Sequence, residues 1–307
     1  MVEDAEQLAL RHRLTDAAQT AAAVAGVTVR GLDAAEMVEA SALLAQVWGT
    51  SPRESPMDPG LLVALDFSGS YVSGAFDATG AMVGACAGFL GEPLGALLHS
   101  HVAAVRPGGP RGVGTALKLH QRAWCADRGL RVIAWTYDPL IARNAWFNLG
   151  RLGAHVEAYL VDFYGPMDDG LNAGEESDRL LVHWPVEPEE VTPPPHVGRT
   201  HAALVVADNG APRAALDVPA DTEAVTLAVP ADVEALRTSD RATASRWRAT
   251  FREAYGRLHE QGWRVRGFVK DGRYVLTRPD QIQSEQSQSE QSTPEQSRPE
   301  QQQTERA

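Results

Sequence analysis

The sequence of 307 residues has little cysteine and few positive charges. Its two cysteines, Cys86 and Cys125, lie in segments with the pattern of a buried strand and a buried helix. This placement argues against a disulfide framework and against a thiolate metal site. Lys and Arg number 28 against 40 Asp and Glu, which gives a formal net charge of -12. This charge argues against a broad surface that binds nucleic acid through its phosphate backbone, and we expect no nucleic-acid partner.

The sequence also lacks a long uninterrupted apolar run. Its most apolar region, residues 81–105, is broken by Glu92, Pro93, His99 and His101, so it cannot cross a bilayer as an apolar helix. The first residues are acidic and charged throughout, unlike the basic and then apolar start of a signal peptide. These features predict a cytoplasmic protein with no membrane partner.

Two segments of biased composition divide the chain. Residues 281–307 repeat Glu, Gln and Ser without any aromatic residue, which predicts a disordered tail. Residues 187–200 are rich in proline and acids, which is typical of a linker. The resulting units are a helical N-terminal lead (1–26), a main domain (27–186) and a C-terminal α+β extension (201–280).

Apolar spacing within the main domain predicts the order β-α-β-β-β-α-β-α-β. The helices are expected at 34–49, 111–128 and 138–154, the last beginning with Asp138-Pro139 as its cap. The strands are expected at 27–33, within 71–91 on either side of a turn at Asp77–Gly80, and at 97–105, 131–137, 155–165 and 178–186. Because hairpins and crossovers are mixed, the fold class is α/β with a mixed, mostly antiparallel central sheet flanked by helices.

The C-terminal extension is expected to pack on the main domain. Strands are predicted at 214–219 and 224–230, followed by a helix with Trp247, Phe251, Tyr255 and Leu258 on one face. A final hairpin turns at Asp271-Gly272, a pair that suits a type I′ turn.

The glycine-rich stretch RPGGPRGVGTA, residues 106–116, joins a predicted strand to a predicted helix. Such a junction directs unpaired backbone amides and the positive end of a helix dipole at one spot, where phosphate binds well. Gly109 and Gly114 have the outer spacing of a P-loop, but Thr115-Ala116 replace its Lys-Ser/Thr. Leu117 replaces the third glycine of a dinucleotide fingerprint.

A third pattern, Arg-x-x-Gly-x-Ala at Arg111, Gly114 and Ala116, resembles the coenzyme A motif of the GNAT acetyltransferase superfamily. Residues 98–124, 135–154 and 178–184 resemble a bacterial family of predicted GNAT acetyltransferases, and the likeness spans residues 27–186. It implies an acyltransferase that moves an acyl group from acetyl-CoA, or another acyl-CoA, to a small-molecule or peptide amine. The residues expected to bind coenzyme A are Val105, Arg106, Arg111, Gly112, Val113, Gly114, Thr115, Ala116 and Asn144.

The resemblance also suggests catalytic residues, with one departure from the family pattern. Leu149 stands where the superfamily often has a tyrosine acid, so Tyr159 or Tyr164 would have to replace it. Asp138 and His101 are the candidate bases, since a base must take a proton from the amine.

Other interpretations of these residues remain open. Asp138-Pro139 is also an ordinary helix start, and His99 and His101 could be core histidines on the sheet face opposite Ser100. These two histidines could also ligate a metal, but no third ligand lies nearby in sequence and we expect no metal. The alternatives for the whole chain are a non-catalytic coenzyme A binding module and a structural interaction protein. The residues point to no particular acceptor or oligomeric state.

Overall fold

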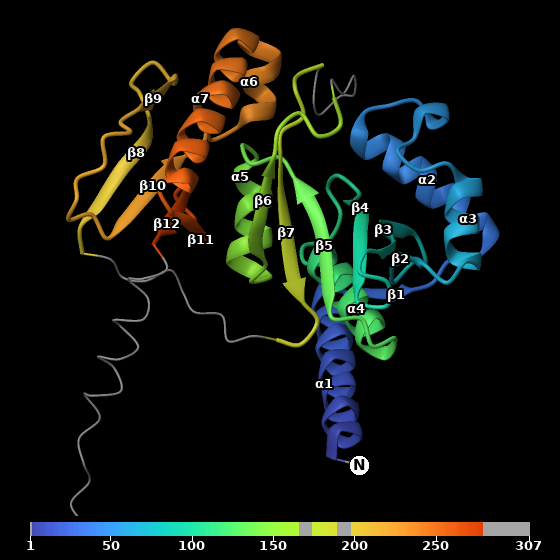
Figure 1. The fold of residues 1–307 in the computed structure, drawn as a ribbon. Coiled ribbons are helices and arrows are strands. Elements are labelled where there is room, and N and C mark those ends of the chain that lie inside the picture. The colour runs from blue at the N-terminus through green and yellow to red at the C-terminus, as the bar shows by residue number, and fades with distance from the viewer. Residues whose placement is uncertain (1, 166–173, 189–197, 279–307) are drawn as a thin grey trace, which may run out of the picture.

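A computed structural model describes residues 2–165, 174–188 and 198–278, with side chains from residue 5 onward. The chain forms two sheets with helices packed around them (Figure 1). The predicted tail at 281–307 and most of the predicted linker at 187–200 lie outside the described residues. No helix in the described part is both long and apolar enough to span a membrane.

The first sheet has seven strands in the order β1-β2-β3-β4-β5-β7-β6. Neighbouring strands are antiparallel except β4 and β5, which are parallel. The strands are β1 (Val27–Arg30), β2 (Tyr71–Asp77), β3 (Met82–Gly91), β4 (Leu97–Val105), β5 (Val132–Tyr137), β6 (His155–Leu160) and β7 (Arg179–Pro185). This arrangement confirms the predicted mixed, mostly antiparallel sheet.

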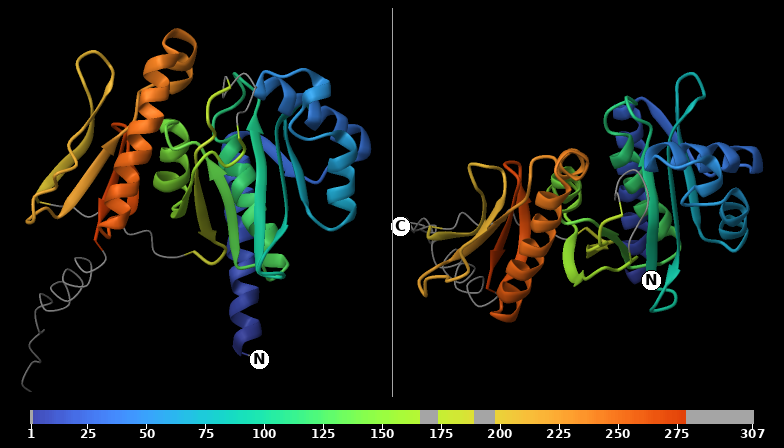
Figure 2. Two further views of the ribbon diagram at one scale, coloured as in Figure 1. Left: turned by 45° about the horizontal axis from the view of Figure 1, so that its top comes forward. Right: turned by 90° about the horizontal axis from the view of Figure 1, so that it is seen from above.

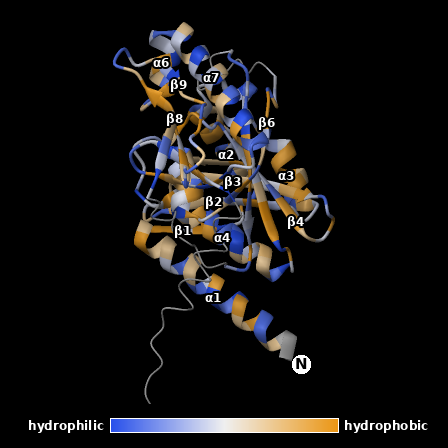
Figure 3. Ribbon diagram, turned by 60° about the vertical axis from the view of Figure 1, so that its left-hand side comes forward, coloured by the Kyte–Doolittle hydropathy of each residue, from blue (hydrophilic) through white to orange (hydrophobic). Residues whose placement is uncertain are grey.

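Helices cover both faces of this sheet (Figure 1). On one face, α4 (Val113–Asp127) packs between the sheet and α1 (Val2–Ala25), which carries hydrophobic and hydrophilic residues in alternating bands (Figure 3). On the other face, α2 (Ala34–Trp48), the 3-10 helix η1 (Pro52–Glu54) and α3 (Pro59–Phe67) enclose a second apolar core. Burying both faces is what makes the sheet stable in water.

Local signals explain where α2 and α3 begin. The Asp33 carboxylate accepts a hydrogen bond from the Glu36 amide while the Glu36 carboxylate accepts one from the Asp33 amide, a complete capping box. Gly49 ends α2 at a φ of 67°, a conformation that favours glycine. Asp58 caps α3 with Pro59 as its first residue. The helix α3 was not among the predicted elements, although this Asp-Pro signal was present.

The helix predicted from Asp138 starts later than expected. Residues 138–141 form a turn in which the Asp138 carboxylate accepts a hydrogen bond from the Leu140 amide at 2.9 Å. Helical structure begins with α5 (Ala142–Ala145) and continues as the π-helix η2 (Trp146–Arg151). The predicted cap was wrong because Ile141 has extended backbone, with φ of -84° and ψ of 94°, and separates the turn at Asp138 from the first helical residue, Ala142.

The second sheet has five strands in the order β11-β12-β10-β8-β9. They are β8 (Thr200–Val206), β9 (Pro212–Ala214), β10 (Ala224–Ala228), β11 (Arg264–Val269) and β12 (Arg273–Thr277). The strand predicted at 214–219 was therefore misplaced. Gly272 has a φ of 89° but Asp271 does not have a positive φ, so the final hairpin does not turn through type I′.

The second sheet and its helices, α6 (Val233–Ser239) and α7 (Arg241–Glu260), pack beside α5 and β6 (Figure 2). The predicted apolar face of α7 is buried and joins the core that also contains Tyr137 and Leu140. The Tyr274 hydroxyl donates a hydrogen bond to the Pro139 carbonyl at 2.8 Å. The two sheets therefore share one apolar core.

Candidate functional site

The parallel strands β4 and β5 separate near the middle of the sheet. Only Leu97–His99 pair with Val132–Ala134, although both strands continue beyond these residues. On β3, Ala87 and Gly88 pair with Val102 and Ser100, which leaves His101 as the extra residue of a β-bulge. The bulge lies where β4 stops pairing with β5, and we call this separation of the carboxyl ends of the two strands the opening.

The glycine-rich turn lies at the end of β4, next to this opening. Gly112 has a φ of 92° and occupies the N-cap position of α4 without any side-chain cap. The first helical hydrogen bond is donated by the Ala116 amide to the Gly112 carbonyl at 2.9 Å. The amides of Val113, Gly114 and Thr115 therefore precede the helical hydrogen-bond ladder and are available to an anion.

The other residues expected at coenzyme A lie around the same turn. A β-carbon on Gly114 would lie 3.7 Å from the Phe147 ring and 3.8 Å from the Val105 side chain. Phe147 belongs to η2, and half-buried Asn144 precedes it by three residues in α5. Arg106 is partly exposed, with its guanidinium 3.8 Å from the Glu39 carboxylate.

Arg111 precedes the helix start and is exposed. The structure thus brings the end of β4, the glycine-rich turn and η2 together, and the roles of Arg111 and Asn144 stay predictions.

Lys118, which the sequence analysis did not select, is buried where β4 and β5 part. Its ammonium donates hydrogen bonds to Ser100 Oγ at 2.9 Å and Gln121 Oε1 at 3.1 Å. It also lies 3.7 Å from the centre of the Trp135 ring. Ser100 and Trp135 are the first residues beyond the paired part of β4 and β5. The ammonium therefore bridges the two strands at the apex of the opening.

The electrostatic setting of Lys118 is unusual for a lysine. Within the described residues no carboxylate forms an ion pair with it, and burial lowers its pKa to about 8. Gly114, Lys118, Gln121 and Cys125 follow one another at helical spacing along α4. This stripe, which leads from the glycine turn into the protein, was the signal that could have identified Lys118.

The opposite face of the sheet carries a half-buried histidine pair. The rings of His99 and His101 lie 6.2 Å apart, and each packs near Phe89, at 5.1 Å and 5.7 Å between ring centroids. Burial lowers the pKa of both histidines, so both are neutral at neutral pH. Ser100 bonds to Lys118 on the α4 face, and the two histidines therefore point to the other face.

Tyr164 reaches this same region of the sheet. Its hydroxyl lies 3.2 Å from the hydroxyl of Thr136 on β5. Thr136 follows Ala134 by two residues and so lies on the same face of β5, and Ala134 pairs with His99. Tyr164 is exposed and lies on the same face of the sheet as the histidine pair. We call this face, with His99, His101 and Tyr164, the histidine face.

Asp138, the other predicted base, has surroundings that do not suit a base. It is 4% exposed and bonds with the guanidinium groups of Arg237 and Arg248 from the C-terminal unit. Burial alone would raise its pKa, but Arg248 and then Arg237 outweigh burial and lower it to about 2. Asp138 is therefore an ionised residue of the contact between the two sheets.

Tyr159, the other predicted acid, is also part of that contact. Its ring packs against Tyr255 and Phe251 of α7, and its hydroxyl donates a hydrogen bond to Asp178 at 2.5 Å. Burial and the neighbouring Asp178 carboxylate raise its pKa well above the usual range. Since Tyr159 pairs with Leu180 of the main core, it points away from the histidine face.

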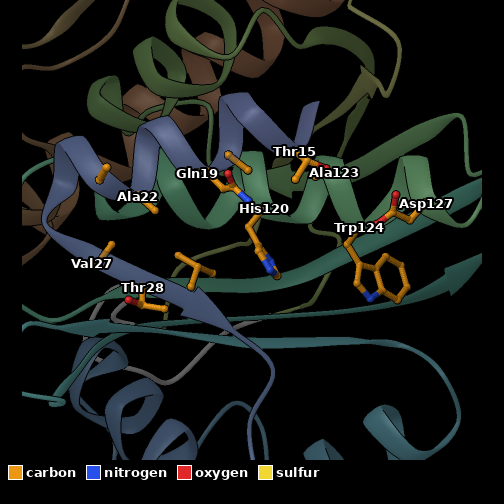
Figure 4. Close-up of a pocket in the computed structure, with 12 residues that line it drawn as sticks. Thr15, Gln19, Ala22, Val27, Thr28, His120, Ala123, Trp124 and Asp127 are labelled. Carbon is orange, nitrogen blue, oxygen red and sulfur yellow. The ribbon is translucent and has the colours of Figure 1, made fainter. Parts of the chain in front are cut away.

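Two cavities lie away from the opening. One, of about 470 Å³, lies between α1, β1 and α4 and is lined by residues that include Gln19, Thr28 and His120 (Figure 4). The other, of about 1040 Å³, lies between η2, β6 and β11. Neither is lined by the glycine-rich turn or by the histidine pair.

No family model matches the chain, and no curated protein matches it either. Solved structures are similar to about half of it. A GNAT superfamily phosphinothricin acetyltransferase from Sinorhizobium meliloti, in complex with AcCoA, is 18% identical with a TM-score of 0.43, covering 56% of this chain and 94% of its own. Naa20 from Chaetomium thermophilum, in complex with a bisubstrate analogue, is 19% identical with a TM-score of 0.42, covering 52% and 86%.

An acetyltransferase of the GNAT family from Streptococcus pneumoniae is 15% identical with a TM-score of 0.42, covering 52% of this chain and 99% of its own. At such identities and scores, the chain is similar to GNAT acetyltransferases in this half, and the likeness carries no activity over to it.

Proposed function

We propose that the chain is an acyl-CoA-dependent N-acyltransferase that takes acetyl-CoA as co-substrate and acylates an amine directly. The observation that carries this proposal is the opening between β4 and β5, which ends at the uncapped N-terminus of α4. The amides of Val113, Gly114 and Thr115 would hold the pyrophosphate, since a helix N-terminus with free amides favours anions. The pantetheine would follow the opening, and the Asn144 side-chain amide would donate a hydrogen bond to a pantetheine carbonyl oxygen.

The remaining predicted contacts fit the same arrangement. Val105 ends β4 and lies beside the turn, where it would pack on the pantetheine. Arg106 and Arg111 are exposed enough to meet phosphate oxygens. The acyl thioester would then lie near the bulge at His101, where β4 and β5 part.

The histidine face would bind the acceptor amine. A neutral His101 would take the proton as the amine nitrogen attacks the acyl carbonyl carbon, and the carbon–sulfur bond would break as the nitrogen–carbon bond is completed. This face is open enough for Tyr164 to remain exposed, which agrees with a small-molecule or peptide amine as acceptor. We leave Asp138 and Tyr159 out of the mechanism because both are bound in the contact with the C-terminal unit.

Lys118 would act on the departing thiolate. Its ammonium lies at the apex of the opening, where a negative charge develops on sulfur and where no carboxylate of the described residues neutralises it. A pKa of about 8 is close to the ordinary thiol value of about 8.5, so a proton can pass to the sulfur without a large penalty. Lys118, with Ser100 as its hydrogen-bond partner, would thus replace the tyrosine that Leu149 displaces.

The test uses two substitutions at one position. Gly114→Glu should abolish binding of acetyl-CoA in calorimetry, because a carboxylate would fill the space in front of the amides and repel phosphate. Gly114→Ala is the matched control and should bind, since its β-carbon would lie at ordinary contact distances of 3.7 Å and 3.8 Å. Failure of the wild-type protein to bind, or equal affinity for the folded Gly114→Glu protein, would contradict the proposal.

A second candidate is a coenzyme A binding module without turnover. The observation in its favour is Leu149, which is 6% exposed in the apolar core where a tyrosine acid would be expected. Thiol release from acetyl-CoA in the presence of amines separates the two candidates. Binding without any thiol release over a broad amine panel would select the non-catalytic module.

A further inference from the structure

Two histidines and a glutamate gather on the edge of the first sheet, outside the proposed acyltransferase machinery. His155 of β6 lies directly opposite His183 of β7 in the antiparallel pairing. Their rings lie 6.1 Å apart, at an interplanar angle of 75°. Glu157 belongs to the same group, with its carboxylate 3.7 Å from His183 Nδ1. One ligand atom from each residue lies within 4.8 Å of the others.

A bulge in β6 helps to form this group. Val156 and Ala158 pair with Val182 and Leu181, so Glu157 is the extra residue with no partner on β7. Bulges of this kind redirect a side chain from its regular position in the ladder. Here the carboxylate reaches the imidazole of the neighbouring strand.

The donor set is that of a zinc-type ion. Two imidazoles and one carboxylate, with one position left open, are a recurrent ligand set for Zn²⁺, with bonds of about 2.0–2.2 Å. The atoms must approach one another from 4.8 Å, and exposed His155 and Glu157 have the freedom to do so.

We propose that His155, Glu157 and His183 bind one divalent transition-metal ion of the zinc type. The carboxylate has a second purpose there, because His155 also lines the cavity that holds Arg264, Arg266 and Lys270. Without Glu157 the positive charges of Arg264, Arg266 and Lys270 would repel a bound metal cation. The site therefore needs the glutamate for charge as well as for coordination.

The register of the sheet locates the ion relative to the histidine pair. His183 pairs with Ala134 of β5, and Ala134 pairs with His99 of β4. Directly paired residues point to the same face, so His155, His183 and His99 form one row across it. Two strand spacings of about 4.8 Å place His183 about 10 Å from His99. The ion would thus lie at the edge of the histidine face, where the proposed function places the acceptor amine. Only this last step rests on the proposed function.

The experiment titrates the full chain, free of any histidine tag and treated with chelator, with ZnCl₂ in a calorimeter. We expect one ion per chain, and CoCl₂ should give the intense visible absorption of four-coordinate cobalt. His155→Ala and His183→Ala should each weaken binding by more than about tenfold, since even the loss of an outer partner of a metal ligand costs that much. Glu157→Gln should weaken it as well.

His12→Ala is the control, because His12 is an exposed histidine of α1 far along the chain from this group. It should bind zinc like the wild-type protein. The absence of saturable binding in the wild-type chain would overturn the proposal, as would unchanged affinity in the double variant His155→Ala/His183→Ala. Neither readout involves coenzyme A, so failure of this site and failure of the acyltransferase proposal are distinguishable.

Discussion

Replacing Asp138 with asparagine should destabilise the contact between the two sheets. The Asp138 carboxylate accepts hydrogen bonds from Arg248 at 2.7 Å and 3.2 Å and is also bonded to Arg237. All three side chains are at most 4% exposed. Asparagine keeps the size of the side chain and can still accept from the Leu140 amide, so the substitution removes little except the charge.

The size of the effect can be bounded in two ways. The arginines lower the pKa of Asp138 from 3.8 to about 2. Such a shift is worth about 2.5 kcal/mol, at about 1.36 kcal/mol per unit. Removing one partner of a buried ion pair costs about 3–5 kcal/mol, because the other charge stays buried. The second figure includes the arginines left behind, but Arg237 keeps the buried Glu175 carboxylate at 3.1 Å. We therefore expect a loss of unfolding free energy at the lower end of this range, about 3 kcal/mol.

The pH dependence has a definite sign. Because the pKa is lower in the folded state, the contribution of Asp138 is complete above its unfolded value of about 3.9. It is lost as pH falls toward the folded value of about 2. The Asp138→Asn variant lacks this contribution at every pH, so the gap between the two proteins should narrow as the pH is lowered from 4 toward 2.

Urea unfolding at neutral pH, followed by tryptophan fluorescence, measures the loss. Glu36→Gln is the matched control, since the pKa of Glu36 is also lowered to about 2, through its hydrogen bond with Arg30, but its side chain is 20% exposed and that of Arg30 49%. Solvent screens such a pair, so its removal should hardly change stability. If Asp138→Asn unfolded like the wild-type protein and yet lost acyl transfer, Asp138 would be the base and our assignment of it would be refuted.

Three further predictions follow from the same contacts. Lys118→Met should slow single-turnover acyl transfer by about a hundredfold or more, because it removes the proposed proton donor. It should not lower stability, because it also removes a buried charge that no carboxylate of the described residues neutralises. A full rate would contradict this role. His101→Asn should lower the transfer rate and leave the affinity for acetyl-CoA unchanged in calorimetry, since His101 lies on the face opposite α4, and a loss of affinity would place it at the cofactor instead. Truncation after Asp280 should leave the thermal midpoint unchanged, because residues 281–307 contain no aromatic residue to bury; a drop of several degrees would show that the tail docks.

The helices and strands of the main domain were predictable where local signals and apolar spacing agree. The helix α2 has both the period of a buried face and a capping box at Asp33 and Glu36. The β2–β3 hairpin has Asp77 accepting from the Thr79 and Ala81 amides, with Gly80 at a φ of 84°. The glycine-rich turn was found for the same reason, since its residues are contiguous in sequence.

The catalytic assignments depended on contacts that are distant in sequence. Asp138 meets Arg237 and Arg248, which follow it by 99 and 110 residues. Nothing in the Asp-Pro pair distinguishes a helix cap from a buried ion pair of this kind. Lys118 was missed for the opposite reason, because a lysine on a helix is ordinarily exposed and only the stripe from Gly114 to Cys125 indicates otherwise.

The strand pattern of the C-terminal unit repeats part of the first domain. In both, two parallel strands are followed by helix and hairpin, so the order β8-β10-β12-β11 matches β4-β5-β7-β6. The difference lies between the parallel strands. Residues 106–131 supply the glycine turn and α4, whereas the fully described residues 207–223 supply only the short β9 and loops.

An uncapped helix N-terminus next to parting parallel strands is what makes the first unit suitable for a pyrophosphate. In the second unit, the described residues between the parallel strands β8 and β10 form no such helix. Its helix α7 instead contributes Arg248, whose guanidinium holds Asp138 at the carboxyl end of β5. On our proposal, the two units thus use one pattern of strands for different purposes, coenzyme A binding in the first and support of β5 in the second.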